Sequence, residues 1–280
     1  MARVAVQLTN FTGGELSPRL DGRNDLAKYS SGCSTLENLI VYPHGSAARR
    51  PGTNFVAAVK DSTKKTRLIP FEFSTTQTYM LEFGNQYIRF YKDNGQILSS
   101  GSAYEISTPY LEAELFDLKF AQSADVMYIC HPNHEVEKLS RTGHTSWSLT
   151  DVDFTKGPFL DANTTTTTLT PSSASTGSRN ITASAVTGIN GGSGFLATDV
   201  GRQIHFNSGY ATITSITSTT VVVATVTTAF TNANAITNWF LGAFSDTTGH
   251  PSCVTFFEQR LVFAATLNNP QTVYFSKSGD

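Results

Sequence analysis

Two histidines three residues apart, His131 and His134, are the side chains of this sequence best suited to chemistry. Cys130 precedes them directly and His144 lies ten residues further on, and imidazole and thiolate are both ligands that zinc uses. A Pro-Asn dipeptide places the pair in a tight turn, however, and neither an HEXXH helix nor a carboxylate pattern completes a site. We therefore interpret the cluster as an ordinary turn and predict neither a metal nor a cofactor.

A second candidate cation site is the alternation of Asp21, Arg23 and Asp25, which is like the start of an EF-hand loop. An arginine at the middle position and the lack of the following ligands argue against calcium.

Glycoside hydrolysis is the enzymatic reaction most worth testing against the residues. Ser140 and Trp147 have the separation of the Ser and Trp in a sialidase Asp box, but Thr and His stand at its Asp and Gly positions. Glu112 and Glu114 illustrate a possible carboxylate pair, although sequence spacing alone does not predict the separation of about 5 to 9.5 Å that glycosidases need. No GxSxG, P-loop or dinucleotide fingerprint is present. We predict that the chain is not an enzyme.

The composition indicates which elements would have to position such residues. Of 280 residues, 39% are hydrophobic and only 15% are charged, against about a quarter in a typical globular domain. Thr, Ser, Asn and Gly replace the missing charge, which favours strands and turns over long helices with solvated faces. We predict an all-β fold. A net charge of -2 argues against a dedicated nucleic-acid binder but allows a channel through which DNA passes.

Cysteine use and hydropathy add two expectations. The three cysteines lie far apart with no CxxC pair, which predicts buried free thiols in a protein assembled in a reducing cytoplasm. Met1–Thr12 lacks the pattern of a signal peptide, and no stretch reaches the roughly 18 to 20 apolar residues of a membrane span, so we predict no membrane insertion. The sequence ends directly after an expected strand, which suggests part of a longer domain.

The chain divides into four zones, of which the first is residues 1–59. Gly, Pro and Asp interrupt this zone too often for a periodic element, so we predict an extended N-terminal assembly segment that wraps over a partner. One short helix is expected over Asp25–Ser31, with Asn24 as its cap.

The second and fourth zones, residues 60–158 and 251–280, share a pattern of short antiparallel strands. We predict that they form one β body, which the third zone interrupts. The hairpin signal at Asn94–Gly95 suits a type I′ turn. Antiparallel strands a few residues apart, each group with an aromatic residue, are typical of propeller blades or a meandering sandwich, and we predict a propeller-like body. The expected strands are Arg67–Phe73, Thr78–Phe83, Gln86–Tyr91, Gln96–Leu98, Asp125–Cys130, Val136–Leu139, Trp147–Leu149, Cys253–Phe257, Arg260–Ala264 and Thr272–Phe275.

The third zone, residues 159–250, is rich in Thr and is predicted to be an inserted small β-barrel or sandwich. Asn163–Arg179 reads as a linker, with a solvent-facing strand as the alternative. The strands expected after it are Asp199–Phe206, Tyr210–Ile216 and Val221–Val226.

Both ends of the sequence carry a distinctive order of residues. At the start these are Phe11, Gly13–Pro18, Asp21–Arg23, Asp25–Leu26, Tyr29, Gly32–Cys33, Leu36–Asn38, Pro43, Gly45 and Arg49–Thr53; near the end they are Gln259–Ala264, Asn269–Pro270 and Phe275–Asp280. Together they resemble the tail nozzle, or tail tubular, proteins of short-tailed bacteriophages, a family that includes DNA stabilisation proteins. The opening stretch is the specific part of the resemblance.

The resemblance implies a structural subunit of the virion tail, assembled in the cytoplasm of the host bacterium. It implies a homo-oligomer, a six-fold ring below the head-to-tail adaptor, whose propeller-like body carries inserted β-domains. Its other partners would be tail fibre proteins, and double-stranded DNA would pass through the central channel without sequence-specific binding. Two alternatives stay open: a carbohydrate-binding or depolymerising tail module, which should show exposed aromatics beside acidic residues in one cleft, and another head-to-tail connector.

The basic residues of the first two zones are the candidate interface residues. Guanidinium groups among Gly and Pro can form bidentate pairs with a neighbouring subunit's carboxylates, although they can also be ordinary solvated loop residues. The candidates for such subunit or adaptor contacts are Arg19, Arg23, Arg49 and Arg50. A basic patch facing DNA, made by Lys64, Lys65 and Arg67 with or without Arg49–Arg50, is the alternative.

Overall fold

The computed structural model describes residues 7–74 and 76–278, so Met1–Val6 and the closing Gly279–Asp280 of the expectations above lie outside the described residues. The described chain is all-β, as predicted, and its helical segments are short 3-10 turns. It divides into two compact units at Phe55/Val56, here called the N-terminal unit and the main unit. No described helix has the length and hydropathy needed to cross a membrane.

Backbone hydrogen bonds hold the N-terminal unit together. The Phe11 amide donates to the Gly45 carbonyl (2.8 Å) and the Gly13 amide donates to the Ser31 carbonyl (2.9 Å). A Cβ on Gly13 would lie 2.8 Å from the Lys28 carbonyl oxygen, so this close approach requires glycine. The elements are β1 (Gly14–Glu15), paired in parallel with β2 (Gly32–Cys33); the hairpin of β3 (Leu39–Val41) and β4 (Ala47–Arg49); and the turns η1 (Pro18–Leu20) and η2 (Tyr29–Ser31).

The helix expected over Asp25–Ser31 is wrong, because only the single 3-10 turn η2 forms there. The Leu26 amide bonds to the Arg23 carbonyl (3.1 Å) and the Tyr29 amide to the Leu26 carbonyl (2.9 Å), which are successive turns rather than i→i−4 bonds. Three residues before Asp25, Gly22 takes a left-handed conformation (φ 78°).

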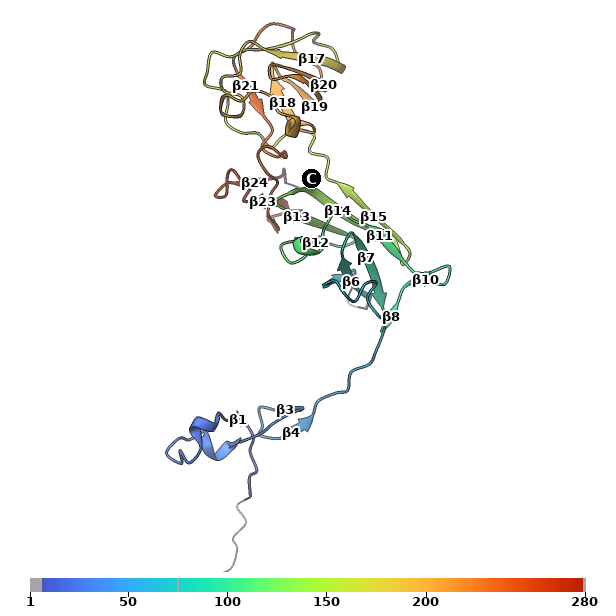
Figure 1. The fold of residues 1–280 in the computed structure, drawn as a ribbon, viewed down its shortest axis with the longest axis vertical. Helices are drawn as coiled ribbons and strands as arrows, with labels where there is room; N and C mark the ends of the chain where they lie inside the picture. The colour runs from blue at the N-terminus through green and yellow to red at the C-terminus, as the bar shows by residue number, and fades with distance from the viewer. Residues whose placement is uncertain (1–6, 75, 279–280) are drawn as a thin grey trace, which may run out of the picture. The chain divides into compact units, whose positions relative to one another are not determined.

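Three antiparallel sheets form the part of the main unit outside the Thr-rich zone (Figure 1). The first has the order β11 (Glu105–Ser107), β7 (Tyr87–Lys92), β6 (Thr78–Gly84), β5 (Arg67–Glu72), with β8 (Gly95–Gln96) also on β7; β9 (Leu98–Ser99) and β10 (Ser102–Ala103) form a small hairpin beside it. The second is the meander β12 (Lys119–Ser123), β13 (Val126–His131), β14 (His134–Gly143), β15 (Ser146–Asp151). The third is β22 (Cys253–Phe257), β23 (Arg260–Ala264), β24 (Val273–Phe275).

Strand β13 of the second sheet contributes side chains to a hydrophobic core on each of its two faces. Met127 and Ile129 belong to one hydrophobic core with residues of the first sheet, such as Phe71. Cys130 belongs to another core with Phe263 of the third sheet. Successive side chains of a strand point to opposite faces, so adjacent residues of β13 enter different cores. Consecutive propeller blades also pack face to face, and the propeller itself stays a prediction.

The hairpin signal at Lys92–Gly95 corresponds to a two-residue turn, shifted by one position from the prediction. Asp93 (φ 52°) and Asn94 (φ 59°) are the two left-handed residues, and Lys92 pairs with Gly95 across the turn. Gly95 therefore begins β8 instead of occupying the turn.

The Thr-rich zone folds into one curled six-stranded sheet with a hydrophobic core of its own (Figure 1). The strand order is β16 (Leu169–Pro171), β17 (Gly177–Ala183), β20 (Val221–Thr228), β19 (Gly209–Ser218), β18 (Gln203–Phe206), β21 (Trp239–Leu241). Leu169 of the first edge strand exchanges backbone bonds of 2.9 and 3.0 Å with Ile236, just before the last edge strand. The two edges of the sheet thus meet in a barrel-like closure.

The linker interpretation of Asn163–Arg179 is wrong, because this segment contributes to the barrel-like sheet. Leu169 and Pro171 are buried in β16, and Thr167 is buried and donates its hydroxyl to the Thr187 carbonyl (2.6 Å). Thr hydroxyls with nearby acceptors let a polar stretch enter a folded domain. The start and end of the zone lie side by side, since the Ala243 amide donates to the Pro158 carbonyl (2.9 Å).

Candidate functional site

The four candidate interface arginines differ in the hydrogen bonds and ion pairs that their side chains make within the chain. Arg23 makes a bidentate pair with Asp25 (2.7 and 2.6 Å), and Arg50 donates to Asn38 (2.7 Å). Among the described residues, the side chains of Arg19 and Arg49 make no hydrogen bond or ion pair. Arg19 and Arg49 are therefore the two guanidinium groups that remain open to a partner.

The three basic residues predicted to face DNA do not share one environment. Lys64 and Lys65 are exposed, whereas Arg67 is half-buried and donates to the Leu115 and Leu118 carbonyls (2.8 and 2.9 Å). The Arg67 guanidinium is thus engaged by the fold, and only the two lysines offer free positive charge. Arg49–Arg50 belong to the other compact unit.

Over residues 7–55, which the structure describes, the N-terminal unit exposes apolar side chains and forms no hydrophobic core. Leu39, Ile40 and Tyr42 on and beside β3 are 41 to 43% exposed. No hydrophobic residue among positions 7–55 is buried, and Gly45 is the one buried residue of that range. Leu39 and its cross-strand partner Arg49 point to one face of the β3–β4 hairpin, and Ile40 and Tyr42 point to the other; we call these four exposed side chains the hairpin surface.

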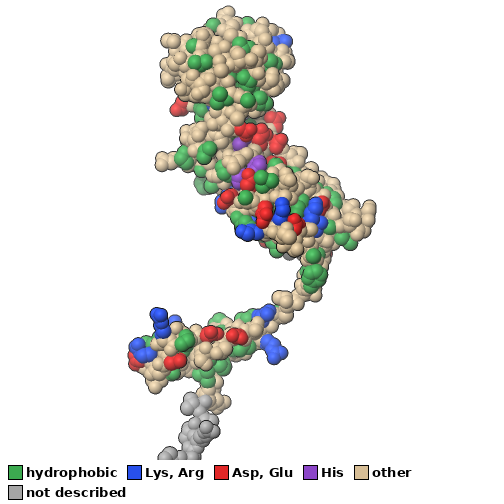
Figure 2. All heavy atoms as spheres, in the orientation of Figure 1, with side chains coloured by type: hydrophobic (Ala, Val, Ile, Leu, Met, Phe, Trp, Pro, Cys, Tyr) green, Lys and Arg blue, Asp and Glu red, His purple; other side chains and the backbone are tan. Residues whose placement is uncertain are grey.

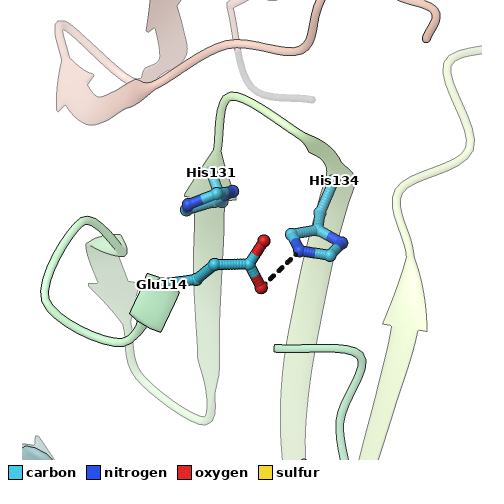
Figure 3. Close-up of side chains that lie close together, drawn as sticks. All are labelled: Glu114, His131 and His134. Atoms are coloured by element: carbon cyan, nitrogen blue, oxygen red, sulfur yellow. Dashed lines mark hydrogen bonds and ion pairs between the residues drawn. The ribbon is translucent and has the colours of Figure 1, made fainter. Parts of the chain in front are cut away.

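A cluster of three titratable side chains lies in the main unit. Glu114, His131 and His134 each offer one ligand atom, and these atoms all lie within 4.8 Å of one another. The Glu114 carboxylate lies between the two imidazole rings, and its Oε2 is 2.9 Å from Nε2 of His134 (Figure 3). Figure 2 shows His and acidic side chains gathered on one face of the main unit.

Two elements bring this His–Glu cluster together. His131 ends β13 and His134 begins β14, and the two residues face each other across the turn between these strands. Glu114 ends η3 (Glu112–Glu114), which the fully buried Leu115 anchors. The Leu111 amide donates to Oε2 of Glu114 (2.8 Å) and fixes the carboxylate toward the histidines.

The electrostatics favour neutral His131 and ionised Glu114. His131 is only 3% exposed, and burial lowers its pKa. Burial opposes ionisation of Glu114 too, but hydrogen bonds from the Leu111 amide and His134 outweigh it and lower the Glu114 pKa. The ionised Glu114 carboxylate accepts its hydrogen bond from His134 Nε2, so a metal ion bound at this nitrogen would displace that proton.

Three buried side-chain oxygens make no hydrogen bond of ordinary geometry among the described residues: Thr108 Oγ1, Tyr110 Oη and Glu137 Oε2. The Tyr110 hydroxyl and the Glu137 carboxyl nevertheless interact with each other. The Tyr110 ring meets the His134 ring edge-on, with the centroids 5.2 Å apart. Burial raises the pKa of Glu137 to about 7. Buried polar groups without partners are rare, and a water molecule or an ion commonly accounts for them.

The sequence points to His131 and His134 as candidate ligands, but the two neighbours expected to join them, Cys130 and His144, lie elsewhere. Cys130 points into the core against the third sheet, and His144 bonds to the Tyr79 hydroxyl (2.6 Å). Glu114 had been considered only as a partner of Glu112, whose Oε1 instead accepts the Lys65 amide (2.8 Å). No sequence signal links Glu114 to the His131–His134 turn, because only the tertiary fold brings them together.

The cysteines also differ from the expectation of three buried thiols. Cys130 is buried, but Cys33 is half-buried and Cys253 is exposed. All three are free thiols.

Ser140 and Trp147, the two residues of the degenerate Asp box, contribute to the sheet and its core. Trp147 is buried and stacks on Phe90 at 4.5 Å, with Phe71 and Tyr79 edge-on to it. Ser140 pairs with Ser148 in the β14–β15 ladder. Trp147 therefore belongs to the core between the first and second sheets.

A separate acidic cleft of about 320 Å³ lies where the barrel-like sheet meets the second sheet. Glu135, Asp151 and Asp153 line it together with the half-buried Phe154. Burial and the neighbouring Asp151 raise the pKa of Glu135. Carboxylates beside an aromatic ring are a feature expected of a saccharide-binding module.

A scan of the sequence against models of protein families finds no match, and a search of curated proteins finds no relative.

Proposed function

We propose that this chain is a structural subunit of a short-tailed bacteriophage tail, a component of the nozzle or tail-tube ring below the head-to-tail adaptor. The observation that carries the proposal is the N-terminal unit. It contains the residues with the most specific resemblance to tail nozzle proteins, and none of its hydrophobic side chains between positions 7 and 55 is buried. A unit of this kind gains stability from a partner surface, as subunits of an assembly do.

The hairpin surface offers both apolar and charged groups for this contact. Exposed Leu39, Ile40 and Tyr42 can be buried by a neighbour, and the open Arg49 guanidinium can pair with a carboxylate at the rim. In this proposal the partner is a second copy of the chain in a six-fold ring, or the adaptor above it.

The main unit supports the same role through its stacked sheets. The second sheet packs between the first and the third, as a blade packs between its neighbours. The aromatic residues of the first two sheets are largely inside this stack, including Phe71, Phe90 and Trp147. A net charge of -2 suits passage of DNA through a channel without tight binding.

Purified virions test the proposal. An antibody against this chain, detected with gold in electron micrographs, should label the tail directly below the capsid, and label should disappear after preadsorption with the pure protein. Label confined to the capsid, or only to the distal fibres, would contradict a nozzle position.

The acidic cleft is the one observation that favours the alternative, a carbohydrate-binding or depolymerising module. Pure protein should then bind or cleave host capsular polysaccharide, and Glu135→Gln should abolish the effect. We expect no such turnover, because Phe154 packs edge-on against Phe244 and Phe263 and so offers no free platform for a sugar ring.

A further inference from the structure

We propose that Glu114, His131 and His134 form a binding site for a divalent transition metal ion, with zinc as the expected occupant. Two imidazoles and one carboxylate are a ligand set that zinc uses, with a water molecule in the fourth position. The inference concerns the main unit alone and does not rest on the proposed tail function.

The geometry is close to what such an ion requires. Zinc–nitrogen and zinc–oxygen bonds of about 2.0 to 2.2 Å at tetrahedral angles separate ligand atoms by about 3.4 Å. The three candidate ligand atoms lie within 4.8 Å of one another, and Glu114 Oε2 and His134 Nε2 are 2.9 Å apart. Side-chain shifts of about 1 Å would bring all three to bonding distance.

A hydrogen-bonded Glu–His pair explains only part of this arrangement. It accounts for Glu114 and His134, but not for a second imidazole ring, that of His131, buried with its centroid 5.1 Å from the His134 ring. Among the described residues, His131 receives one hydrogen bond, a long one from the Asn133 amide to Nδ1 (3.2 Å). Metal ligation through Nδ1 of His131 would displace this one long contact, and ligation through Nε2 would leave it in place.

A buried polar residue, Tyr110, lies directly against the cluster. Its side chain is completely buried and interacts with the nearly buried Glu137, although Tyr110 Oη and Glu137 Oε2 make no hydrogen bond of ordinary geometry in the described chain. Groups around a metal commonly hydrogen-bond its ligands or the water bound to it. The Tyr110 ring meets the His134 ring edge-on, so Tyr110 is the buried polar residue placed to support a ligand in this way.

The position of the site suggests a stabilising role. The ion would tie η3 to the turn between β13 and β14, and the same turn accepts a hydrogen bond from the His250 amide at the Pro132 carbonyl (3.1 Å). Metal binding to the folded state alone raises its apparent stability.

The test is zinc titration of EDTA-treated full-length protein against a chromophoric chelator, followed by metal analysis after dialysis. We expect about one tightly bound zinc ion per chain and a higher melting temperature with zinc. Glu114→Gln and His131→Ala should each weaken binding at least about tenfold. Far-UV circular dichroism checks that each variant is folded.

His44→Ala and His205→Ala are the matched controls, because His44 lies in the N-terminal unit and His205 lies in β18 of the barrel-like sheet. Both should bind zinc like the original chain. Absence of tight binding, binding unaffected by Glu114→Gln and His131→Ala, or binding lost in His205→Ala would overturn the proposal. Should a variant not fold, crystals of the unaltered protein grown with zinc decide the matter: an anomalous peak must lie between the three side chains.

Discussion

Arg202 and Asp199 form an ion pair of 2.9 Å in which the two side chains are 1% and 0% exposed. Arg202 Nε also donates to the Gly242 carbonyl (2.8 Å), and Asn190 bonds to both members of the pair. The Leu196 amide donates to the second Asp199 oxygen (2.9 Å). The network thus joins η4 (Asn190–Gly192), η5 (Ala197–Asp199) and the segment that follows β21.

Asp199→Asn should destabilise the barrel-like sheet by about 3 to 5 kcal/mol, because it leaves the Arg202 charge buried without a counter-charge. Chemical denaturation followed by circular dichroism measures the change. Asp25→Asn removes one charge from the exposed pair with Arg23 and should leave the unfolding midpoint unchanged. Equal midpoints for Asp199→Asn and the original chain would show that the network contributes nothing to stability.

Glu137 should make the metal-free protein lose stability as the pH rises from about 4.5 to 7. Burial raises its folded-state pKa from 4.5 to about 7, so the folded state binds the proton more tightly than the unfolded state in this range. The loss amounts to at most about 3 kcal/mol and is complete above pH 7. Urea unfolding in EDTA at several pH values measures it. Glu137→Gln should flatten this dependence; an unchanged slope would exclude Glu137 as its source.

Arg49→Glu should block incorporation into tails without unfolding the protein. Arg49 makes no described side-chain bond, so the substitution costs the isolated chain little, whereas it reverses charge on the hairpin surface. Arg50→Glu should add to the effect but also breaks the bond to Asn38. Melting curves and quantitative immunoblots of purified tails separate assembly from folding. Lys64→Glu is the control with the same charge change, and equal incorporation of all variants would remove Arg49 from the interface.

Deletion of residues 160–243 should leave the remainder of the main unit folded. The core of the barrel-like sheet contains no residue from outside this segment, and the Pro158 carbonyl already bonds to the Ala243 amide. A short Gly-Ser linker can therefore join the ends. A cooperative melting transition of the deletion protein is the expected result. Loss of all cooperative unfolding would mean that the segment and its surroundings fold as one.

Strands with alternating hydrophobic residues were predictable from the sequence because their pattern is local. β5 and β6 lie within one residue of the expected ranges, since Ile69 and Phe71 face the core while Leu68 and Pro70 do not. The turn at Asp93–Asn94 was located for the same reason, although which two residues are left-handed depends on strand register.

What could not be predicted depends on contacts between distant residues. Leu169 is a strand residue because Ile236 supplies its partner, and no local pattern in a run of threonines contains that information. Glu114 joins the histidines because Leu115 and Leu118 bury the segment that carries it. The sequence therefore indicated the two histidines of the His–Glu cluster but not the glutamate that joins them.

The pairing of Leu169 with Ile236 has a consequence for solubility. An open six-stranded sheet would expose two rows of unpaired amides and carbonyls, and such edges recruit strands from other molecules. Here a backbone bridge between Leu169 and Ile236 joins the two edges, and the Leu160 and Asn163 amides donate to the Leu241 and Trp239 carbonyls of β21 (2.9 Å each). Many copies of this sheet can therefore be crowded together with little tendency to join edge to edge into aggregates.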